Sequence, residues 1–299
     1  MAELNLLAPP PWEEYDLIDS GNGAKLERFG QYMLVRPETQ AIWSPHLSER
    51  EWQRADATFE KLRGEDGAGL WHQRRQLPEQ WLMHHDNLAF WARLTPFRHT
   101  GVFPEHSAQW AWMRRQLASR REARVLALFG YTGLSSLEAA RVGAHVVHVD
   151  ASKPALRWAQ DNQQASGLTD RSIRWLIDDA SKFVAREIRR GRRYDLILMD
   201  PPIFGRGPSG EIWRLHEQLP GLVRESVALL SDNPLGVLIS AYATNISALT
   251  LQNVLGAAMA RHQGTTSAGE LVLRESASGR LLPAAIYACW SCGAPPHQE

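Results

Sequence analysis

The sequence of 299 residues has few of the features that mark secreted, membrane-spanning or disulfide-linked proteins. It contains only two cysteines, Cys289 and Cys292, which are too few for a domain built on disulfides. No segment approaches the roughly 18 consecutive apolar residues that a membrane-spanning helix requires. The stretch from Met1 to Trp12 lacks a basic start followed by an apolar run, so no signal peptide is expected. These absences indicate a cytoplasmic protein.

The sequence also lacks an excess of charge of either sign. Lys and Arg together number 33, as do Asp and Glu, so a strongly cationic nucleic-acid binder is not indicated. Residues 1–100 hold 11 basic against 15 acidic side chains, so the basic excess lies in the remainder. Two arginine groups stand out there: Arg114, Arg115, Arg120, Arg121 and Arg124, and Arg186, Arg189, Arg190, Arg192 and Arg193. We interpret both as solvated helix faces or ends in preference to RNA contacts.

The first 97 residues have a β-like pattern and predict a small β-rich domain. Strands are expected at 15–19, 25–29 and 32–36, with the turn between the first two at Ser20–Gly23. A hairpin is expected from 82–85 and 88–93, and a loop at 64–69. This segment contains Trp12, Trp43, Trp52, Trp71, Trp81 and Trp91. Tryptophans can stack on bases, but they more often form the core of a small β domain, which is the interpretation preferred here.

Beyond residue 98 the pattern changes to strands that alternate with helices. The expected strands are 125–129, 146–149, 173–177, 196–199, 236–240, 271–274 and 285–290. The expected helices are 134–141, 154–166, 182–190, 220–230 and 247–261. Such alternation predicts an α/β domain with a largely parallel sheet and helices on both faces.

Glycine-rich or acidic motifs follow four successive strands of this pattern. They are Phe129-Gly130-Tyr131-Thr132-Gly133, Val149-Asp150-Ala151-Ser152, Asp178-Asp179-Ala180 and Asp200-Pro201-Pro202. Ligands of open α/β sheets bind at the carboxyl ends of strands, where an acidic side chain can accept hydrogen bonds from ribose hydroxyls. Each acidic residue alone is equally typical of a helix cap, but four such motifs together indicate a nucleoside cofactor. A dinucleotide is disfavoured because the first motif lacks the G-x-G-x-x-G spacing.

Together with Ile203-Phe204 and the segment His99–His106 (HTGVFPEH), these motifs resemble the class I methyltransferases that modify 23S rRNA. That group contains cytosine-5 and guanine-N7 enzymes, and the resemblance covers roughly residues 80–292. It implies a Rossmann-like class I methyltransferase domain at 98–299 with a mostly parallel seven-stranded sheet. The smaller β-rich domain at 1–97 is then a candidate for substrate recognition. The implied cofactor is S-adenosylmethionine.

The resemblance also implies which residues surround the cofactor. Those expected at its methionine, ribose and adenine parts are Phe129, Gly130, Tyr131, Thr132, Gly133, Asp150, Ala151, Ser152, Asp179 and Ala180. Those expected to close the site, or to border both cofactor and acceptor, are Thr100, Gly101, Phe103 and Asp200.

On the acceptor side, Asp200 is the expected catalytic residue, because its carboxylate can accept a proton or hydrogen bond from an N–H group. Pro201 and Pro202 fix the backbone beside it. Phe204 is expected either to stack on an extruded base or to anchor its loop. The glycine-rich segment that follows offers three further candidates for substrate contact, with exposed charge or core packing as their alternatives: Arg206, Glu211 and Trp213.

The segment after the predicted fifth strand, residues 240–244, lacks the cysteine that the cytosine-5 branch carries there. Without a thiolate to add to the base, cytosine-5 transfer is disfavoured. Cys289 and Cys292 are expected to pack on the last strand, and two cysteines are insufficient for a zinc site, so no metal is expected. The sequence thus favours methylation of a nitrogen of an RNA base, in particular in rRNA, with RNA or ribosomal particles as partners. A protein side chain or small molecule as acceptor, and a non-catalytic RNA-binding or assembly protein, stay open as alternatives.

Overall fold

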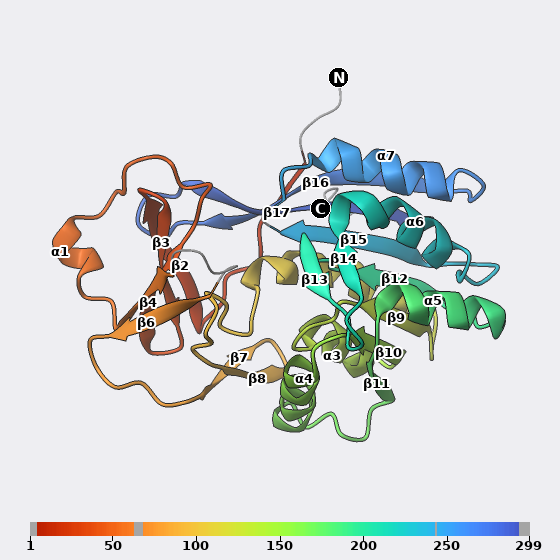
Figure 1. Ribbon diagram of the computed structural model, residues 1–299, viewed down its shortest axis with the longest axis horizontal. Helices are drawn as coiled ribbons and strands as arrows, with labels where there is room; N and C mark the ends of the chain where they lie inside the picture. Colours follow the sequence, from red (N-terminus) through yellow and green to blue (C-terminus); the bar gives the residue numbers. More distant parts are fainter. Residues whose placement is uncertain (1–4, 63–67, 243, 293–299) are drawn as a thin grey trace. The chain divides into compact units, whose positions relative to one another are not determined.

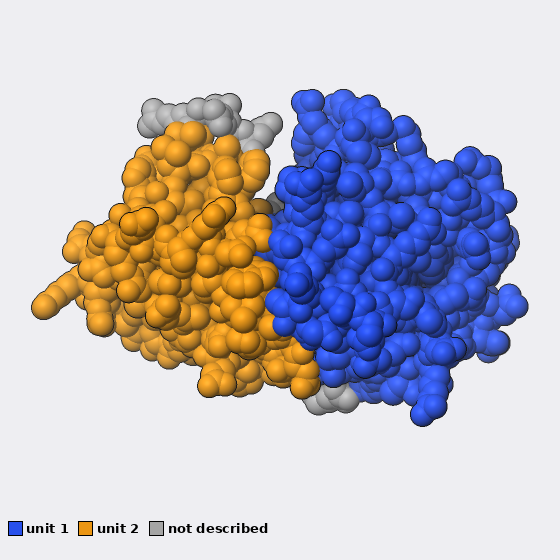
Figure 2. All heavy atoms as spheres, turned by 90° about the horizontal axis from the view of Figure 1, so that it is seen from below, with its two compact units in different colours: residues 1–7, 106–271, 284–299 blue, residues 8–105, 272–283 orange. Residues whose placement is uncertain are grey.

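The computed structural model describes residues 5–62, 68–242 and 244–292. These residues form two compact units (Figure 2), a larger one from 5–7, 106–271 and 284–292 and a smaller one from 8–105 and 272–283. The division therefore differs from the predicted boundary after residue 97, since the larger unit begins at His106 and residues 272–283 belong to the smaller unit. No helix in the described ranges is both long and apolar enough to cross a membrane.

The larger unit is built on an eight-stranded sheet. Its strands are β1 (Asn5–Leu7), β9 (Arg124–Leu128), β10 (His145–Asp150), β11 (Ile173–Ile177), β12 (Leu196–Met199), β15 (Gly236–Tyr242), β16 (Thr265–Arg274) and β17 (Leu281–Ser291). Residues 272–274 of β16 and 281–283 of β17 fall in the smaller unit. The strands lie in the order β1-β16-β17-β15-β12-β9-β10-β11, and β17 runs antiparallel to β15. This arrangement confirms the predicted α/β fold. The sheet has one strand more than the seven expected, because β1 pairs in parallel with β16.

Helices pack against both faces of this sheet (Figure 1). One group consists of α2 (Trp110–Ala118), α3 (Leu134–Arg141) and α4 (Lys153–Ala165), and the other of α5 (Ala180–Arg189), α6 (Leu215–Val227) and α7 (Ala248–Met259). The second group forms one buried core with alternate strand residues such as Leu126 and Leu128. The residues between them, Val125 and Ala127, are also buried but lie outside that core, so they face the first group. Burial on both faces explains why these strands are almost wholly apolar.

The smaller unit is a β structure, as the sequence predicts. Its five-stranded sheet contains β2 (Tyr15–Gly21), β3 (Ala24–Phe29), β4 (Tyr32–Pro37), β5 (Ala57–Lys61) and β6 (Gly69–Gln73), with the short helix α1 (Glu49–Trp52) between β4 and β5. The expected second hairpin is also present, as β7 (Trp81–His85) and β8 (Leu88–Ala92). Asn22 and Gly23 form the predicted turn with φ of 51° and 78°. Most of the expected loop at 64–69 lies outside the described residues.

A buried ion network lies within the smaller unit. Glu27 on β3 is fully buried and accepts hydrogen bonds of 2.7 Å from both Nε and Nη2 of Arg36 on β4. The hydroxyl of Tyr15 donates to the same carboxylate at 2.9 Å. Burial alone would raise the pKa of Glu27, but Arg36 and Lys25 hold it below its ordinary value. The fully paired charge is therefore retained inside the β sheet.

The six tryptophans of the N-terminal region are buried or half-buried. Trp12 stacks on His85 with ring centroids 3.9 Å apart. The indole N–H groups of Trp52 and Trp71 donate to the Asp19 carboxylate at 2.9 Å and to the carbonyl of Thr95 at 2.7 Å. These contacts support the interpretation of the tryptophans as packing residues.

The core of the larger unit predicts a contrast between two phenylalanines. Phe183 on α5 is 2% exposed, so Phe183→Ala should lower the free energy of unfolding by about 3–5 kcal/mol. Phe204 is 48% exposed, so Phe204→Ala should change it by no more than about 0.5 kcal/mol. Urea denaturation followed by circular dichroism measures both variants, and equal losses would contradict the described core.

Candidate functional site

Four strand ends meet at one edge of the large sheet. Strands β10 and β12 lie on either side of β9 and run parallel to it, with Val149 and Met199 both opposite Leu128. Strand β11 continues the edge, because its last residue, Ile177, pairs with Asp150. The four predicted motifs therefore follow neighbouring strands at the point where strand order reverses. This position is the usual ligand site of an open α/β sheet.

The loop after β9 is held in an unusual backbone conformation. Phe129, Tyr131 and Gly133 have φ of 57°, 49° and 83°. A Cβ atom at Gly130 would lie 2.2 Å from Cε1 of His148, and one at Gly133 would lie 2.9 Å from Cβ of Ala159. Larger residues at these two positions would thus push the loop away from the sheet edge. The glycines let the backbone follow the edge closely, as a ligand-binding loop requires.

His148 supports this loop from inside the sheet. It is fully buried, and burial lowers the pKa of its imidazole to about 3, so the ring is neutral. The hydroxyl of Ser136 on α3 lies 2.9 Å from its Nδ1. His148 is therefore a packing residue beneath Gly130, and the strand pattern alone gave no sign of this role.

The carboxylate of Asp150 joins two loops. One oxygen accepts the backbone N–H of Tyr131 and the other that of Ser152, each at 2.8 Å. Burial raises the pKa of Asp150, and these two hydrogen bonds oppose that rise. On the other side of the loop, the buried amide of Asn162 on α4 donates to the carbonyl of Thr132 at 3.0 Å. The second strand end is thus bound firmly to the first.

The third motif forms the start of α5. The side chain of Asp179 accepts the backbone N–H of Lys182 at 2.9 Å and caps the helix, and Ala180 is the first helical residue. Asp178 accepts the N–H of Asp179 and forms an ion pair with Arg186. The capping alternative is therefore correct for Asp179, and its contact with an adenine stays a prediction.

The fourth motif brings Asp200 beside a histidine that sequence reasoning did not select. The Asp200 carboxylate lies 3.9 Å from Nε2 of His106, which belongs to the 3₁₀ helix Pro104–Gln109. A gap of this length is wider than a direct hydrogen bond and suits a bridging polar group. The signal that could have identified His106 is its place in the segment that resembled the methyltransferases.

The residues after Asp200 form a hairpin of β13 (Phe204–Arg206) and β14 (Ile212–Arg214), where a loop was expected. Trp213 is 4% exposed, donates its indole N–H to the carbonyl of Pro202 at 2.6 Å and packs on Phe129 at 5.0 Å between ring centroids. Core packing, the expected alternative to substrate contact for Trp213, accounts for these contacts. Glu211 pairs with Lys182, which with backbone hydrogen bonds lowers the pKa of Glu211 to about 2. The predicted contacts of Trp213, Glu211 and the exposed Arg206 with the substrate stay predictions.

Thr100, Gly101 and Phe103 belong to the smaller unit. Thr100 is buried and its carbonyl accepts the N–H of Arg93 at 3.1 Å. Gly101 has a φ of 93°, and the ring of Phe103 lies 5.2 Å from that of His99. That these residues close the cofactor site stays a prediction.

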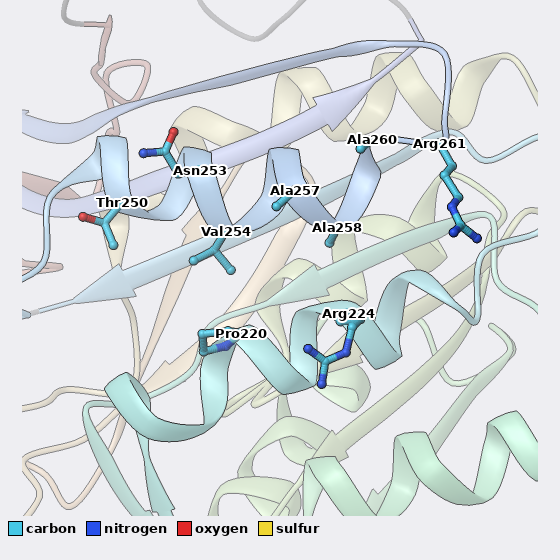
Figure 3. A pocket seen from close by; sticks show the side chains of 9 residues that line it. All are labelled: Pro220, Arg224, Thr250, Asn253, Val254, Ala257, Ala258, Ala260 and Arg261. Atoms are coloured by element: carbon cyan, nitrogen blue, oxygen red, sulfur yellow. The ribbon is translucent and has the colours of Figure 1, made fainter.

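A separate hollow of about 770 Å³ lies between α6 and α7 (Figure 3). Its walls carry the side chains of Pro220, Arg224, Thr250, Asn253, Val254, Ala257, Ala258, Ala260 and Arg261. None of the strand-end residues lines it, so it is distinct from the site at the sheet edge. Among the residues described, no cluster of His, Cys, Asp or Glu is arranged to hold a metal ion.

Comparison with known proteins identifies the family of the chain. The model of the S-adenosylmethionine-dependent methyltransferase family matches residues 33–241. The chain belongs to this family. The match begins well before residue 80, so it includes strands of the smaller unit that the motif resemblance did not cover. The cofactor is S-adenosylmethionine, and the glycine positions of the β9 loop and the half-buried Asp150 carboxylate fit a nucleoside with a polar tail.

Individual relatives agree with the family. The crystal structure of a methyltransferase from Agrobacterium tumefaciens is 42% identical, with a TM-score of 0.92 over 98% of this chain and 97% of that one. Ribosomal RNA large subunit methyltransferase K from Neisseria meningitidis is 24% identical over 79% of this chain and 66% of its own length. The K/L enzyme from Chromohalobacter salexigens is 32% identical over 60% of this chain and 21% of its own. The chain thus spans just under two-thirds of the first curated relative and about a fifth of the second.

The geometry predicts the effect of removing the Asp150 carboxylate. Asp150→Ala should weaken S-adenosylmethionine binding by about 1–3 kcal/mol, or roughly 5- to 150-fold, because charge-assisted hydrogen bonds are lost. Asp170→Ala removes an exposed carboxylate from the same unit and should leave affinity unchanged. Isothermal titration calorimetry measures both variants. Wild-type affinity in Asp150→Ala would remove this residue from the cofactor site.

Proposed function

We propose that this methyltransferase modifies a nitrogen of an RNA base, in rRNA, in the cytoplasm. The observation that carries the proposal is the Asp200-Pro201-Pro202 motif at the strand-order reversal, followed two residues later by the exposed ring of Phe204. A carboxylate beside a stacking ring suits an extruded base with an N–H group. The names of the relatives, rRNA large subunit methyltransferases, support rRNA or a ribosomal particle as the partner.

On the cofactor side, the residues after each strand contact a different part of S-adenosylmethionine. Gly130 and Gly133 give the methionine part access to the β9 loop, beside Phe129. The Asp150 oxygens each accept one backbone N–H and retain lone pairs for the ribose hydroxyls. Asp179 and Ala180 border the adenine.

Bound S-adenosylmethionine supplies a methyl group on a positively charged sulfur, so the protein's tasks are alignment and exclusion of water. The Asp200 carboxylate accepts the hydrogen bond of the attacking amino or ring N–H group and then takes up its proton. His106, 3.9 Å away, leaves room for a polar group of the acceptor between its ring and this carboxylate. Pro202 keeps the backbone extended and fixes the hairpin through its carbonyl.

The positions of both cysteines argue against cytosine-5 chemistry. Cys289 is 1% exposed on β17, and burial raises the pKa of its thiol to about 11. Cys292 follows Ser291, which pairs with Gly236 at the amino end of β15. Asp200 follows the carboxyl end of β12, which runs parallel to β15, so Cys292 lies at the opposite edge of the sheet. Neither thiol is available to add to a base beside Asp200.

Substitution of Asp200 tests the acceptor role. Asp200→Ala should abolish transfer of labelled methyl groups to undermodified large-subunit rRNA while S-adenosylmethionine affinity stays within about twofold of wild type. Asp232→Ala, which removes an exposed carboxylate from the same unit, should retain full activity. Scintillation counting of RNA and calorimetry provide the two measurements.

The same assay decides between acceptor classes when protein extract and metabolites are offered beside RNA. Label in protein or metabolites alone would overturn the RNA proposal and leave the family assignment intact. Unchanged activity in Asp200→Ala would remove Asp200 from the mechanism, and loss of cofactor binding would move it to the cofactor side.

The cysteine positions predict that no covalent enzyme–cytosine intermediate forms. RNA that contains 5-fluorocytosine should leave no adduct resistant to denaturing electrophoresis, because no thiolate lies near Asp200. Cys289→Ala and Cys292→Ala should both retain methyl transfer. An adduct that either substitution abolishes would show that cytosine-5 chemistry takes place.

A further inference from the structure

The hairpin of β13 and β14 has two different faces. Its register pairs Phe204 with Arg214, Gly205 with Trp213, and Arg206 with Ile212. Directly paired residues of an antiparallel hairpin point to the same side, and successive pairs alternate. One face therefore consists of Gly205 and Trp213, and the other of Phe204, Arg206, Ile212 and Arg214. We call this second group the hairpin face.

Trp213 anchors the hairpin by the first face. Its ring is 4% exposed and packs on Phe129, and its indole N–H binds the carbonyl of Pro202. The carbonyl of Ile203 also accepts the N–H of Leu215 at 2.9 Å, where α6 begins. At the tip, Glu211 accepts the N–H of Ser209 at 2.9 Å and pairs with Lys182. The hairpin face is therefore presented on a fixed support close to Asp200.

The hairpin face combines exposed apolar groups with positive charge. Phe204 is 48% exposed and Ile212 51%, which is unusual for two large apolar side chains that share one small surface. Arg206 is exposed and forms no ion pair with any residue that the structure describes. Arg214 lies 3.5 Å from Glu217, and both side chains are more than half exposed, so that pair contributes little. The two arginines occupy one diagonal and the apolar side chains the other.

We propose that the hairpin face binds the RNA strand that flanks the target nucleotide, an inference that rests on the proposed function. Arg206 and Arg214 contact neighbouring phosphates, and diagonal positions about 7–8 Å apart suit long side chains that reach along a backbone. Phe204 stacks on the target base, as proposed above, and Ile212 lies against the base or sugar next to it, as in sites that bind single strands without reading their sequence. The net positive charge favours a phosphate backbone over a protein surface. Elsewhere in the larger unit, Arg114 and Arg120 are paired with Glu138 and Asp195.

Salt dependence of RNA binding tests this surface. The probe is a fluorescein-labelled oligouridylate of about 15 nucleotides, with affinity measured by fluorescence anisotropy over a range of KCl concentrations. Arg206→Gln and Arg214→Gln should each lower affinity several-fold at low salt and reduce the slope of log affinity against log salt by about 0.7. Phe204→Ala and Ile212→Ala should lower affinity roughly fivefold or more with the slope unchanged.

The matched control is Arg189→Gln. Arg189 ends α5, which begins at the carboxyl edge of the sheet and runs back toward the amino edge, so the same charge is removed far from the hairpin. This variant should bind the probe as wild type does. Calorimetry with S-adenosylmethionine and thermal melting should give wild-type values for all five variants, so that loss of RNA binding is not misread as loss of folding.

The outcomes separate this inference from the proposed function. Wild-type slopes and affinities in all four hairpin variants would overturn the hairpin face as an RNA surface, even if the wild-type enzyme methylates RNA. An equal loss in Arg189→Gln would also overturn it, since binding would then follow total charge. Methylation of protein instead of RNA would overturn the proposed function, and the expected losses of probe binding in the hairpin variants would still support a single-strand surface.

Discussion

The half-buried carboxylate of Asp150 is the interaction on which the sheet edge after β9 and β10 depends. A parallel sheet aligns the strand ends but leaves the loops that follow them free to move apart. Asp150 prevents this separation by accepting one backbone N–H from the loop after β9 and one from the start of α4. Because one carboxylate accepts both N–H groups, the two loops are held to the same side chain. Gly130 completes the arrangement, since only a glycine fits above the neutral ring of His148.

Electrostatics within the larger unit explains how a chain without net charge can still carry local positive charge. Many arginines serve the fold: Arg114 and Arg141 share Glu138, and Arg120 pairs with Asp195. These pairs connect α2 and the residues after it to α3 and to Asp195 before β12, so the charges of these arginines are already paired within the fold. Charge for a phosphate backbone must then be local. Arg206, close to the Asp200 motif, supplies local positive charge of this kind. The net charge of the chain does not reveal where such charge lies.

Much of the larger unit was predictable because apolar strands and amphipathic helices alternate regularly along its sequence. Helix α3 and strands β11 and β12 have the predicted bounds, and parallel strands necessarily bring motifs at their ends to one edge. Strand β1 was not predictable, because three residues carry no period and their partners on β16 lie more than 260 positions away. The hairpin of β13 and β14 was missed because Gly205–Gly210 has the composition of a loop. Helix α6 begins at Leu215, earlier than expected, because Pro220 is typical of a first turn but here lies inside the helix.

The site residues show a different limit, since one side chain often has a structural and a ligand role at once. Asp179 caps α5 through one oxygen, and this cap orients the carboxylate at the sheet edge where a nucleoside would lie. Capping and cofactor binding are therefore compatible for this residue. Trp213 differs, because its ring is buried and its only polar atom is bound to Pro202, so it acts through the hairpin that it anchors. Sequence identifies residues of the right chemical type, whereas only burial and hydrogen-bond geometry separate a side chain that supports the site from one that faces it.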